Sequence, residues 1–181
     1  MLMLVSRAEQ IFGRVDLFEQ AVCQRLNRGC QRVWVRSLFR VVSRLGDGVF
    51  WYSLMLALHC LWGEAGLKAS LVMAVTGAVG LLLYKSLKHR LVRERPYIRF
   101  VGIEAAMAPL DRYSFPSGHT LHAVAFTVVA TYYFPMLAWL LVPMAVLVAI
   151  SRVVLGLHYP TDVLAGALLG ALLAVSAIFL F

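Results

Sequence analysis

Long apolar stretches separated by short polar turns dominate the chain from residue 46 to its end. Five of them approach the roughly 20 apolar residues that a helix needs to cross a bilayer. They are Gly46 to Gly63, Leu67 to Tyr84, Gly118 to Phe134, Met136 to Leu157 and Thr161 to Phe181. The pattern therefore predicts an all-α, polytopic membrane helical bundle with about five transmembrane helices.

The segment before the first apolar stretch follows a different pattern, in which an arginine recurs every fourth residue from Arg32 to Arg44. This spacing places the arginines on one face of a helix, and apolar side chains such as Trp34 fill the rest. A basic amphipathic helix of this kind suits the membrane interface, although packing on the bundle would give the same pattern. Residues 5 to 27 predict a second, weaker amphipathic helix. We therefore divide the chain into interfacial helices at 1–45 and a transmembrane domain at 46–181.

The composition excludes a soluble domain, because 61% of the residues are hydrophobic and only 14% are charged, against about 25% charged in soluble domains. The first apolar run is too short for a signal peptide, so we expect the N-terminus to be retained. The three cysteines, Cys23, Cys30 and Cys60, lack the spacing of a zinc site or a disulfide framework. We interpret them as packing residues.

Charge is concentrated on one side of the predicted bundle. Five crossings bring the segment after the second stretch, the turn before the third and the connection between the fourth and fifth to one face. The N-terminal helices share that face, which then holds every Lys and Arg except Lys68 and most of the net charge of +8. Such a face suits lipid phosphates, a phosphorylated substrate or cytoplasmic retention. Membrane lipids are the expected partners, and no nucleic acid is expected.

Three ordered signatures lie on this face. They are K-x6-R-P, from Lys88 through Arg95 to Pro96; P-S-G-H, from Pro116 to His119; and S-R-x5-H-x3-D, from Ser151 through Arg152 and His158 to Asp162. As a set, the signatures closely resemble those of the type 2 phosphatidic acid phosphatase (PAP2) superfamily, which includes bacterial lipid phosphatases and the vanadium haloperoxidases. The resemblance covers just under half of the chain.

The side chains of these signatures suit the binding of a phosphate group. Lys88, Arg95 and Arg152 supply positive charge, and arginine can contact two phosphate oxygens at once. Ser117 is a helix-capping residue for the third apolar stretch. Beside it, the amide of Gly118 faces outward from a helix N-terminus, where anions bind and where glycine allows close approach. We expect these five residues to bind the phosphate of the substrate.

Two histidines with different neighbours predict two catalytic roles. Pro160 can begin the fifth helix, and Asp162 then lies in its first turn, where it can orient one ring nitrogen of His158 and leave the other free to attack phosphorus. The resemblance implies that His158 forms a phosphoenzyme, that Asp162 supports it and that His119 protonates the leaving oxygen. No metal or other cofactor is expected, because this face lacks a carboxylate cluster that would hold magnesium or a metal pair.

The other polar residues of the region receive structural or interfacial interpretations. His122, one turn after His119, is expected to pack or to form an interface hydrogen bond, with substrate contact as the alternative. His59 is expected to be structural. The interface and the general attraction of anions account for the remaining basic residues, which are Lys85, His89, Arg90, Arg93 and Arg99.

The resemblance implies an enzyme that removes phosphate from a lipid phosphate or pyrophosphate. Undecaprenyl pyrophosphate, phosphatidylglycerophosphate and phosphatidic acid are equally good candidates, because each has a phosphate head on an apolar tail. The alternative is a membrane protein that binds or transports lipid phosphate without hydrolysis. Binding alone would need only the cations, so the presence of His119, His158 and Asp162 favours the enzyme. The apolar stretches disfavour a soluble haloperoxidase.

The side of the membrane on which the site lies is predicted differently by two arguments. The positive-inside rule places the basic face in the cytoplasm, whereas bacterial lipid phosphatases of this kind generally face the periplasm or the cell exterior. The cations are needed for phosphate, and the opposite loops carry almost no charge for comparison. We therefore expect a multi-pass protein of the bacterial cytoplasmic (inner) membrane, with its site facing the periplasm or the cell exterior.

Overall fold

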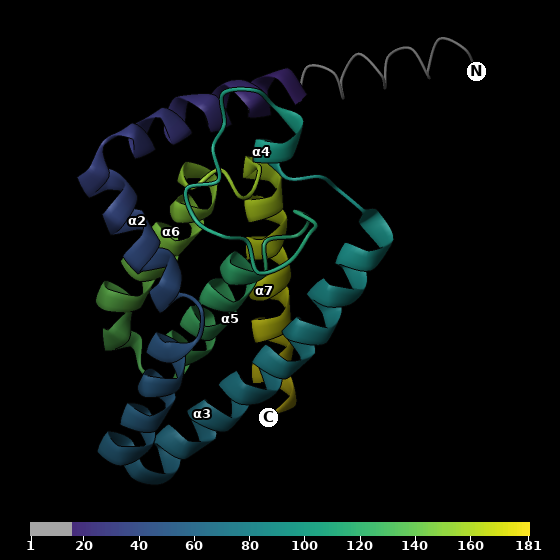
Figure 1. The fold of residues 1–181 in the computed structure, drawn as a ribbon. Coiled ribbons are helices and arrows are strands. Elements are labelled where there is room, and N and C mark those ends of the chain that lie inside the picture. The colour runs from purple at the N-terminus through teal and green to yellow at the C-terminus, as the bar shows by residue number, and fades with distance from the viewer. Residues whose placement is uncertain (1–15) are drawn as a thin grey trace.

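The computed structural model describes residues 16–181, and the regular secondary structure of that part of the chain is entirely helical (Figure 1). Residues 16–27 are helical and lead into a 3-10 turn. The elements that follow are η1 (Arg28–Gln31), α2 (Val33–Leu45), α3 (Val49–Leu91), α4 (Pro96–Arg99), α5 (Gly118–Tyr133), η2 (Pro135–Leu137), α6 (Ala138–Val154) and α7 (Pro160–Leu180). The predicted all-α class is confirmed. Part of the helix predicted at 5–27 lies outside the described residues.

Helix α3 consists of two arms that correspond to the first and second predicted apolar stretches. It bends at Gly63, whose φ of 55° lies in the left-handed region that glycine adopts without strain. The Ser70 hydroxyl on the second arm donates a hydrogen bond of 2.7 Å to the Met55 carbonyl oxygen on the first. His59 Nδ1 lies 3.4 Å from the Gly63 carbonyl oxygen, which fits the expected structural role of this histidine. The arms diverge from the bend toward the motif-bearing end (Figure 1).

Within residues 16–181, three helical stretches are long and apolar enough to cross a membrane. They are Val49–Arg99, which includes the bend of α3, and the two stretches Pro135–Val154 and Pro160–Leu180. Helix α5 occupies the third predicted stretch, but its 16 residues span only about 24 Å at 1.5 Å per residue, less than a hydrocarbon core of about 30 Å. The structure thus has helices at all five predicted positions, and five crossings remain a prediction.

Helix α5 lies at the centre of the bundle and packs against α3, α6 and α7. Its contact with α7 is made close by two glycines. A Cβ atom at Gly166 would lie 2.5 Å from the Ser117 carbonyl oxygen, and one at Gly170 would lie 2.3 Å from the Leu121 carbonyl oxygen. Neither position tolerates a side chain, so α7 fixes the position of the start of α5, which carries P-S-G-H.

Helix α2 has both features that its sequence pattern allowed. It packs on α6, with Val42 and Ser43 buried at the contact. Trp34, Leu38 and Val41 are exposed along one stripe at helical spacing. An apolar stripe that the protein itself does not cover suits contact with acyl chains, so the interfacial location of α2 remains a reasonable prediction.

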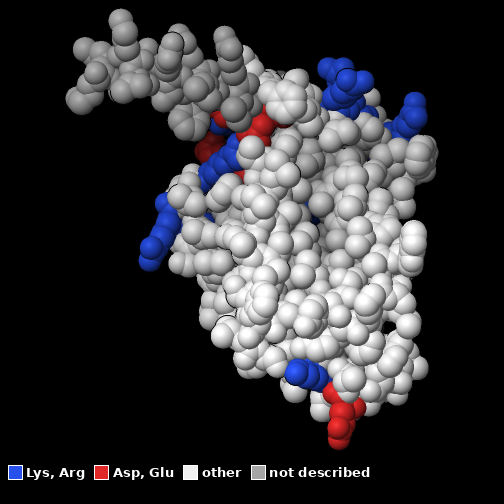
Figure 2. All heavy atoms as spheres, turned by 180° about the vertical axis from the view of Figure 1, so that it is seen from behind, with Lys and Arg blue, Asp and Glu red and all other residues white. Residues whose placement is uncertain are grey.

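The loops that carry the signatures meet at one end of the bundle, next to the helical residues 16–27 (Figure 1). Figure 2 shows Lys, Arg, Asp and Glu gathered mainly toward this end, with one small group at the opposite end and uncharged surface between them. From residue 49 to residue 84 the chain carries only two charged residues, Glu64 and Lys68, both near the bend of α3. The predicted concentration of basic residues at one end is therefore observed.

Candidate active site

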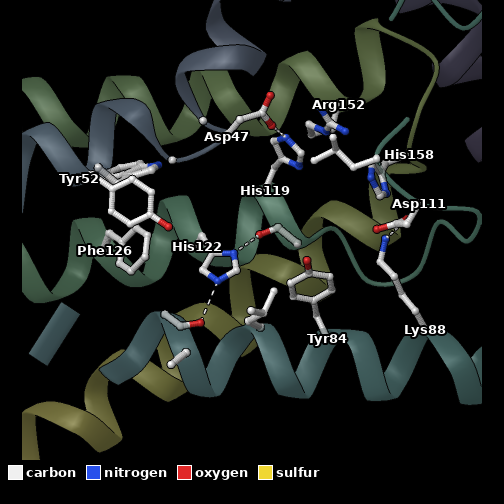
Figure 3. Close-up of a pocket in the computed structure, with 18 of the residues that line it drawn as sticks. Asp47, Tyr52, Tyr84, Lys88, Asp111, His119, His122, Phe126, Arg152 and His158 are labelled. Carbon is white, nitrogen blue, oxygen red and sulfur yellow. Dashed lines mark hydrogen bonds and ion pairs between the residues drawn. The ribbon is translucent and has the colours of Figure 1, made fainter. Parts of the chain in front are cut away.

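The three signatures meet at a cavity of about 430 Å³ that is bounded by both arms of α3, by α5, by the end of α6 and by the loops before α5 and α7. Six of the predicted site residues line it: Lys88, Arg95, Gly118, His119, Arg152 and His158. Figure 3 shows Lys88, His119, Arg152 and His158 pointing into the same end of this cavity. The other two predicted residues, Ser117 and Asp162, are fully buried just behind its wall.

Arg95, which precedes α4, forms hydrogen bonds through all three of its guanidinium nitrogens. Nε donates to the Asp111 carbonyl oxygen (3.1 Å), Nη1 to the Leu157 carbonyl oxygen (2.7 Å) and Nη2 to the Asp111 carboxylate (2.6 Å). Nη1 also lies 3.3 Å from Nε2 of His158. The residue is 1% exposed. Arg95 is therefore held rigidly in the wall of the cavity.

Lys88, near the end of α3, shares the Asp111 carboxylate with Arg95. Its Nζ donates to Asp111 Oδ1 (2.7 Å) and to the Tyr113 carbonyl oxygen (2.9 Å). Burial raises the pKa of Asp111, but the hydrogen bond and charge of Lys88, together with Arg95, outweigh burial and hold this pKa below its usual value. Asp111 is thus ionised at neutral pH and partly neutralises both cations.

Arg152, in the last turn of α6, is the third cation of the cavity. Its Nη1 donates to the hydroxyl of Ser43, which comes from α2. The residue is 2% exposed, and its Nε has no hydrogen-bond partner within residues 16–181. A buried donor without a partner is energetically costly, so Arg152 has a donor available for an anion in the cavity.

The P-S-G-H turn forms the predicted helix start. The Ser117 hydroxyl accepts from the Thr120 amide (3.4 Å) and caps α5, as predicted. Gly118 lies at the cavity wall, where a Cβ atom would approach the Tyr84 ring to 3.2 Å. The first amides of a helix have no partner within the helix and attract anions. The turn thus places polarised amides beside the three cations, although the Ser117 side chain itself does not line the cavity.

His158 lies in the loop between α6 and α7 and is 1% exposed. A guanidinium only donates, so Nε2 of His158 accepts from Arg95 and the ring proton is on Nδ1, which faces Asp162 Oδ2 at 3.6 Å. Burial lowers the pKa of His158 well below its usual value, and the charges of Arg152 and Arg95 lower it further. The ring is therefore neutral and its lone pair is on Nε2, the nitrogen that nucleophilic attack would use in place of the Arg95 hydrogen bond.

Asp162 lies in the first turn of α7, which begins at Pro160 as predicted. Its Oδ2 accepts from the Tyr159 amide (2.9 Å) and its Oδ1 from Arg93 Nη1 (2.6 Å). The 3.6 Å between Asp162 Oδ2 and His158 Nδ1 exceeds hydrogen-bond length. The carboxylate thus faces the ring from a fixed position, at a distance that a small movement would close.

His119, in the first turn of α5, pairs through Nε2 with the Asp47 carboxylate, which comes from the turn between α2 and α3. Its other ring nitrogen points toward Arg152 and His158 in Figure 3. The Asp47 carboxylate fixes the orientation of the ring and leaves the other nitrogen facing the cavity, a geometry that suits a proton donor. His119 and His158 thus have different partners, in agreement with the two predicted roles.

His122 has the structural role that its position suggested. Its Nδ1 lies 3.0 Å from the Gly118 carbonyl oxygen and its Nε2 lies 3.1 Å from the Gly77 carbonyl oxygen, so it links α5 to the second arm of α3. It also lines the cavity, and in Figure 3 it lies between the charged end and an apolar end at Tyr52 and Phe126. The other large apolar residues that the two arms of α3 contribute to the lining are Trp51, Met55 and Leu81.

The structure adds charged residues that sequence reasoning missed and corrects two interpretations. Asp47 and Asp111 lie outside the signatures, and no spacing connects them to the cations. The interfacial role expected for Arg93 is wrong, because its guanidinium points inward to Asp162. Cys23 and Cys30 are buried as expected, whereas Cys60 is exposed, so the packing interpretation is wrong for Cys60. Within residues 16–181 no group of three or more His, Cys, Asp or Glu side chains is placed to hold a metal ion.

Comparison with known proteins identifies the family. Residues 65–180 match the family model of the PAP2 superfamily. The chain belongs to this superfamily. YbjG of Escherichia coli (strain K12) is 30% identical over 152 residues, which cover 80% of this chain and 72% of YbjG. The undecaprenyl-diphosphatase of Sulfolobus acidocaldarius is 34% identical over 106 residues, which cover 58% of this chain and about half, 51%, of that protein.

The fold agrees with this assignment. The crystal structure of a transmembrane PAP2-type phosphatidylglycerolphosphate phosphatase from Bacillus subtilis superposes with a TM-score of 0.75 and 27% sequence identity, covering 92% of this chain and 86% of that one. The chain is thus a phosphatase of the PAP2 type, as the signatures implied, and a membrane protein. The enzyme is favoured over the non-hydrolytic alternative.

The first prediction concerns the Asp111 carboxylate, which occupies the donors of Lys88 and Arg95. Replacing it in Asp111→Asn removes a negative charge that competes with phosphate for the same cations. We expect inorganic phosphate to inhibit this variant of the PAP2 phosphatase about tenfold more strongly. A tenfold change in the inhibition constant corresponds to about 1.4 kcal/mol of binding free energy, which is modest for the removal of a charge in contact with the two cations. The measurement is the inhibition constant of phosphate in detergent with a soluble phosphate ester.

Glu94→Gln is the matched control, because Glu94 is an exposed acidic residue of the same end of the molecule that does not line the cavity. Its inhibition constant should equal that of the wild type. Inhibition of Asp111→Asn that is equal to or weaker than wild type would contradict a competing role for Asp111.

Proposed function

We propose that this protein hydrolyses a lipid phosphate or lipid diphosphate through a phosphohistidine intermediate and without a metal ion. In this proposal residues 46–181 form the catalytic domain and residues 1–45 lie at the membrane interface. The observation that carries the proposal is a single cavity with a charged, histidine-bearing end and an apolar, aromatic end. A molecule that fills both ends has a phosphate head and a hydrocarbon tail.

The charged end supports the binding of phosphate. Lys88, Arg95 and Arg152 line it together with the start of α5 at Gly118. Three buried cations and the amides at the start of α5 can compensate the charge of a phosphate and of the more highly charged five-coordinate transition state. Because Leu157 and Ser43 already hold the guanidinium groups of Arg95 and Arg152, these two groups need little reorganisation when the substrate binds.

The apolar end supports the binding of a lipid tail. Tyr52 and Phe126 lie in Figure 3 on the opposite side of the cavity from Asp111 and His158. This end is formed by the two arms of α3 and by α5, the elements that the proposal places within the bilayer. A tail in the membrane could therefore enter between the arms without leaving an apolar environment, which a soluble phosphate ester would not require.

In the first step, the lone pair of His158 Nε2 attacks phosphorus and forms a P–N bond while the P–O bond to the leaving group breaks. His119 donates its proton to the leaving oxygen, and its Asp47 partner stabilises the charged ring before the transfer. Asp162 faces the Nδ1–H of His158 and stabilises the positive charge that the ring acquires.

In the second step, water attacks the phosphohistidine. His119, now neutral, accepts a proton from this water, the new P–O bond forms, and the P–N bond breaks so that its electron pair returns to Nε2 of His158. Inorganic phosphate and the dephosphorylated lipid are the products. Both steps use only side chains that line the cavity or support it, so no metal ion is required for the charge balance.

The second prediction is the direct test of this function. Purified protein in detergent with EDTA should release phosphate from at least one of undecaprenyl pyrophosphate, phosphatidylglycerophosphate and phosphatidic acid, and vanadate should inhibit the release as a mimic of the five-coordinate transition state. Arg152→Ala should lower turnover on the order of 100-fold or more, as loss of a preorganised charge partner does.

Arg36→Ala is the control for the Arg152 variant, because Arg36 lies on α2 and does not line the cavity. Its turnover in detergent should match wild type. Activity that EDTA abolishes and magnesium restores would overturn the metal-independent mechanism, and phosphate release from none of the three lipids would overturn the lipid substrates proposed here.

We also propose that the protein lies in a bacterial inner membrane with its site facing the periplasm. The support for this orientation is that the basic residues at the site serve phosphate binding. Lys88 and Arg95 are both paired with Asp111, and His119 is paired with Asp47. Because the site accounts for these residues, their positive charge is weak evidence for the cytoplasmic side. The loop between α4 and α5 would then be accessible from outside the cell.

The third prediction tests this orientation at Val101, which is 96% exposed in that loop. A cysteine introduced by Val101→Cys, in a background with the three native cysteines replaced, should react with a membrane-impermeant thiol reagent in intact spheroplasts. A cysteine introduced at Lys68, near the bend of α3, should react only after lysis. The opposite labelling pattern would place the site in the cytoplasm.

A further inference from the structure

Arg93 connects the catalytic aspartate to a part of the chain outside the three signatures. Two residues before Arg95, it points away from the cavity wall and donates from Nη1 to Asp162 Oδ1 (2.6 Å) and to the Thr161 hydroxyl (2.8 Å). Its guanidinium carbon lies 3.9 Å from the centre of the Tyr159 ring, a stacking contact that fixes the plane of the guanidinium. Arg93 thus holds one of the two carboxylate oxygens of Asp162.

This contact determines which way the carboxylate faces. With Oδ1 bound to Arg93, Oδ2 accepts from the Tyr159 amide (2.9 Å) and is the oxygen that faces His158 Nδ1. Rotation of the carboxylate about its bond would break both the Arg93 contact and the amide contact. The orientation of Asp162 toward His158 therefore depends on Arg93 as well as on the backbone of its own helix.

Glu19 holds Arg93 from the other side. It comes from the helical residues 16–27, and its side chain is 2% exposed. One carboxylate oxygen accepts from Arg93 Nη2, and the other accepts from the Thr161 amide (2.9 Å) and the Thr161 hydroxyl (2.6 Å). Glu19 thus binds an unpaired amide at the start of α7, where a negative charge is favoured, and fixes Arg93 beside Asp162.

The same helix contacts the catalytic loop at successive turns. Cys23, four residues after Glu19, has its Sγ 3.9 Å from the His158 carbonyl oxygen, and the Asn27 side chain donates to the Val154 carbonyl oxygen (3.0 Å). All three side chains are buried. Glu19, Cys23 and Asn27 therefore form one buried stripe against the loop that carries His158 and the helix ends on either side of it, so Glu19 has little freedom to move.

We propose that Glu19 and Arg93 are positioning residues for the Asp162–His158 pair. The N-terminal helix, residues 16–27, then contributes to catalysis although it lies outside the residues that match the family model. The inference rests on the proposed role of His158 as nucleophile. Glu19 fixes Arg93, Arg93 fixes the Asp162 carboxylate, and the carboxylate orients the ring whose Nε2 attacks phosphorus. Neither residue lines the cavity, so both act on the reaction only through Asp162.

The fourth prediction follows from this dependence. Arg93→Met and Glu19→Gln should each lower kcat by about 10- to 100-fold, the range typical of partners that orient a functional histidine, with Arg93→Lys restoring part of the loss. The KM of the substrate and the inhibition constant of inorganic phosphate should stay within about twofold of wild type, because the phosphate-binding cations are untouched.

The decisive measurement is a double-mutant cycle with Asp162→Asn. If Glu19 and Arg93 act through Asp162, then Glu19→Gln or Arg93→Met should change the residual kcat of Asp162→Asn by less than about threefold. Glu19→Gln keeps the shape of the side chain, so it tests the inference even if Arg93→Met does not fold. Effects that are the same in the wild-type and Asp162→Asn backgrounds would show a merely structural role and would overturn the inference.

The matched control is the ion pair between Asp16 and Arg99 (2.8 Å), which joins the same N-terminal helix to α4 but does not contact Asp162. Asp16→Asn and Arg99→Met should leave kcat unchanged. A loss of kcat in these controls equal to that of Glu19→Gln would overturn the inference, because docking of the helix alone would then explain it. A wild-type protein that releases no phosphate would instead overturn the proposed function, and the inference with it.

Discussion

The convergence of three cations at one buried site is the constraint on which the rest of the structure depends. Arg95 and Arg152 are almost completely buried and Lys88 is nearly so, and positive charges brought together out of water repel one another and lose hydration. Carboxylates offset part of this cost, since Asp111 binds two of the cations. Burial, together with this concentration of charge, keeps His158 neutral, so the site proposed to bind phosphate also keeps the proposed nucleophile ready to attack it.

The scaffold places these charges by close packing of apolar helices. Gly166 and Gly170 bring α7 against α5, so the helix that carries Asp162 and the helix that begins after Ser117 share one rigid contact. The Ser117 amide donates to the Asp162 carbonyl oxygen (3.0 Å), which ties two of the signatures together through the backbone. Helices α2 and 16–27 then supply Ser43 and Glu19 from outside the bundle core. The site is therefore assembled from nearly the whole described chain.

Much of this arrangement could be predicted from the sequence, because hydropathy indicated the helices and the ordered signatures indicated the residues that we propose bind and transfer phosphate. The partners of these residues could not be predicted. Asp47 and Asp111 reach the cavity from a turn and a loop whose course depends on tertiary packing, and no local pattern distinguishes them from other surface carboxylates. Glu19 has a weak local signal, because Cys23 and Asn27 follow it at helical spacing, but its partners lie more than 70 residues away. The first two predicted stretches form the two arms of α3, which meet at the bend at Gly63.

The measurement that tests the central claim most directly is the identification of the phosphorylated residue. Brief incubation with a radioactive phosphate donor, followed by denaturation in alkali and peptide analysis, should place an alkali-stable, acid-labile label on His158. The label should be absent from His158→Ala and should form more slowly in Asp162→Asn with the fold intact. An acid-labile label that still forms in His158→Ala, or a label on another residue of the wild-type protein, would contradict the account in which His158 attacks phosphorus.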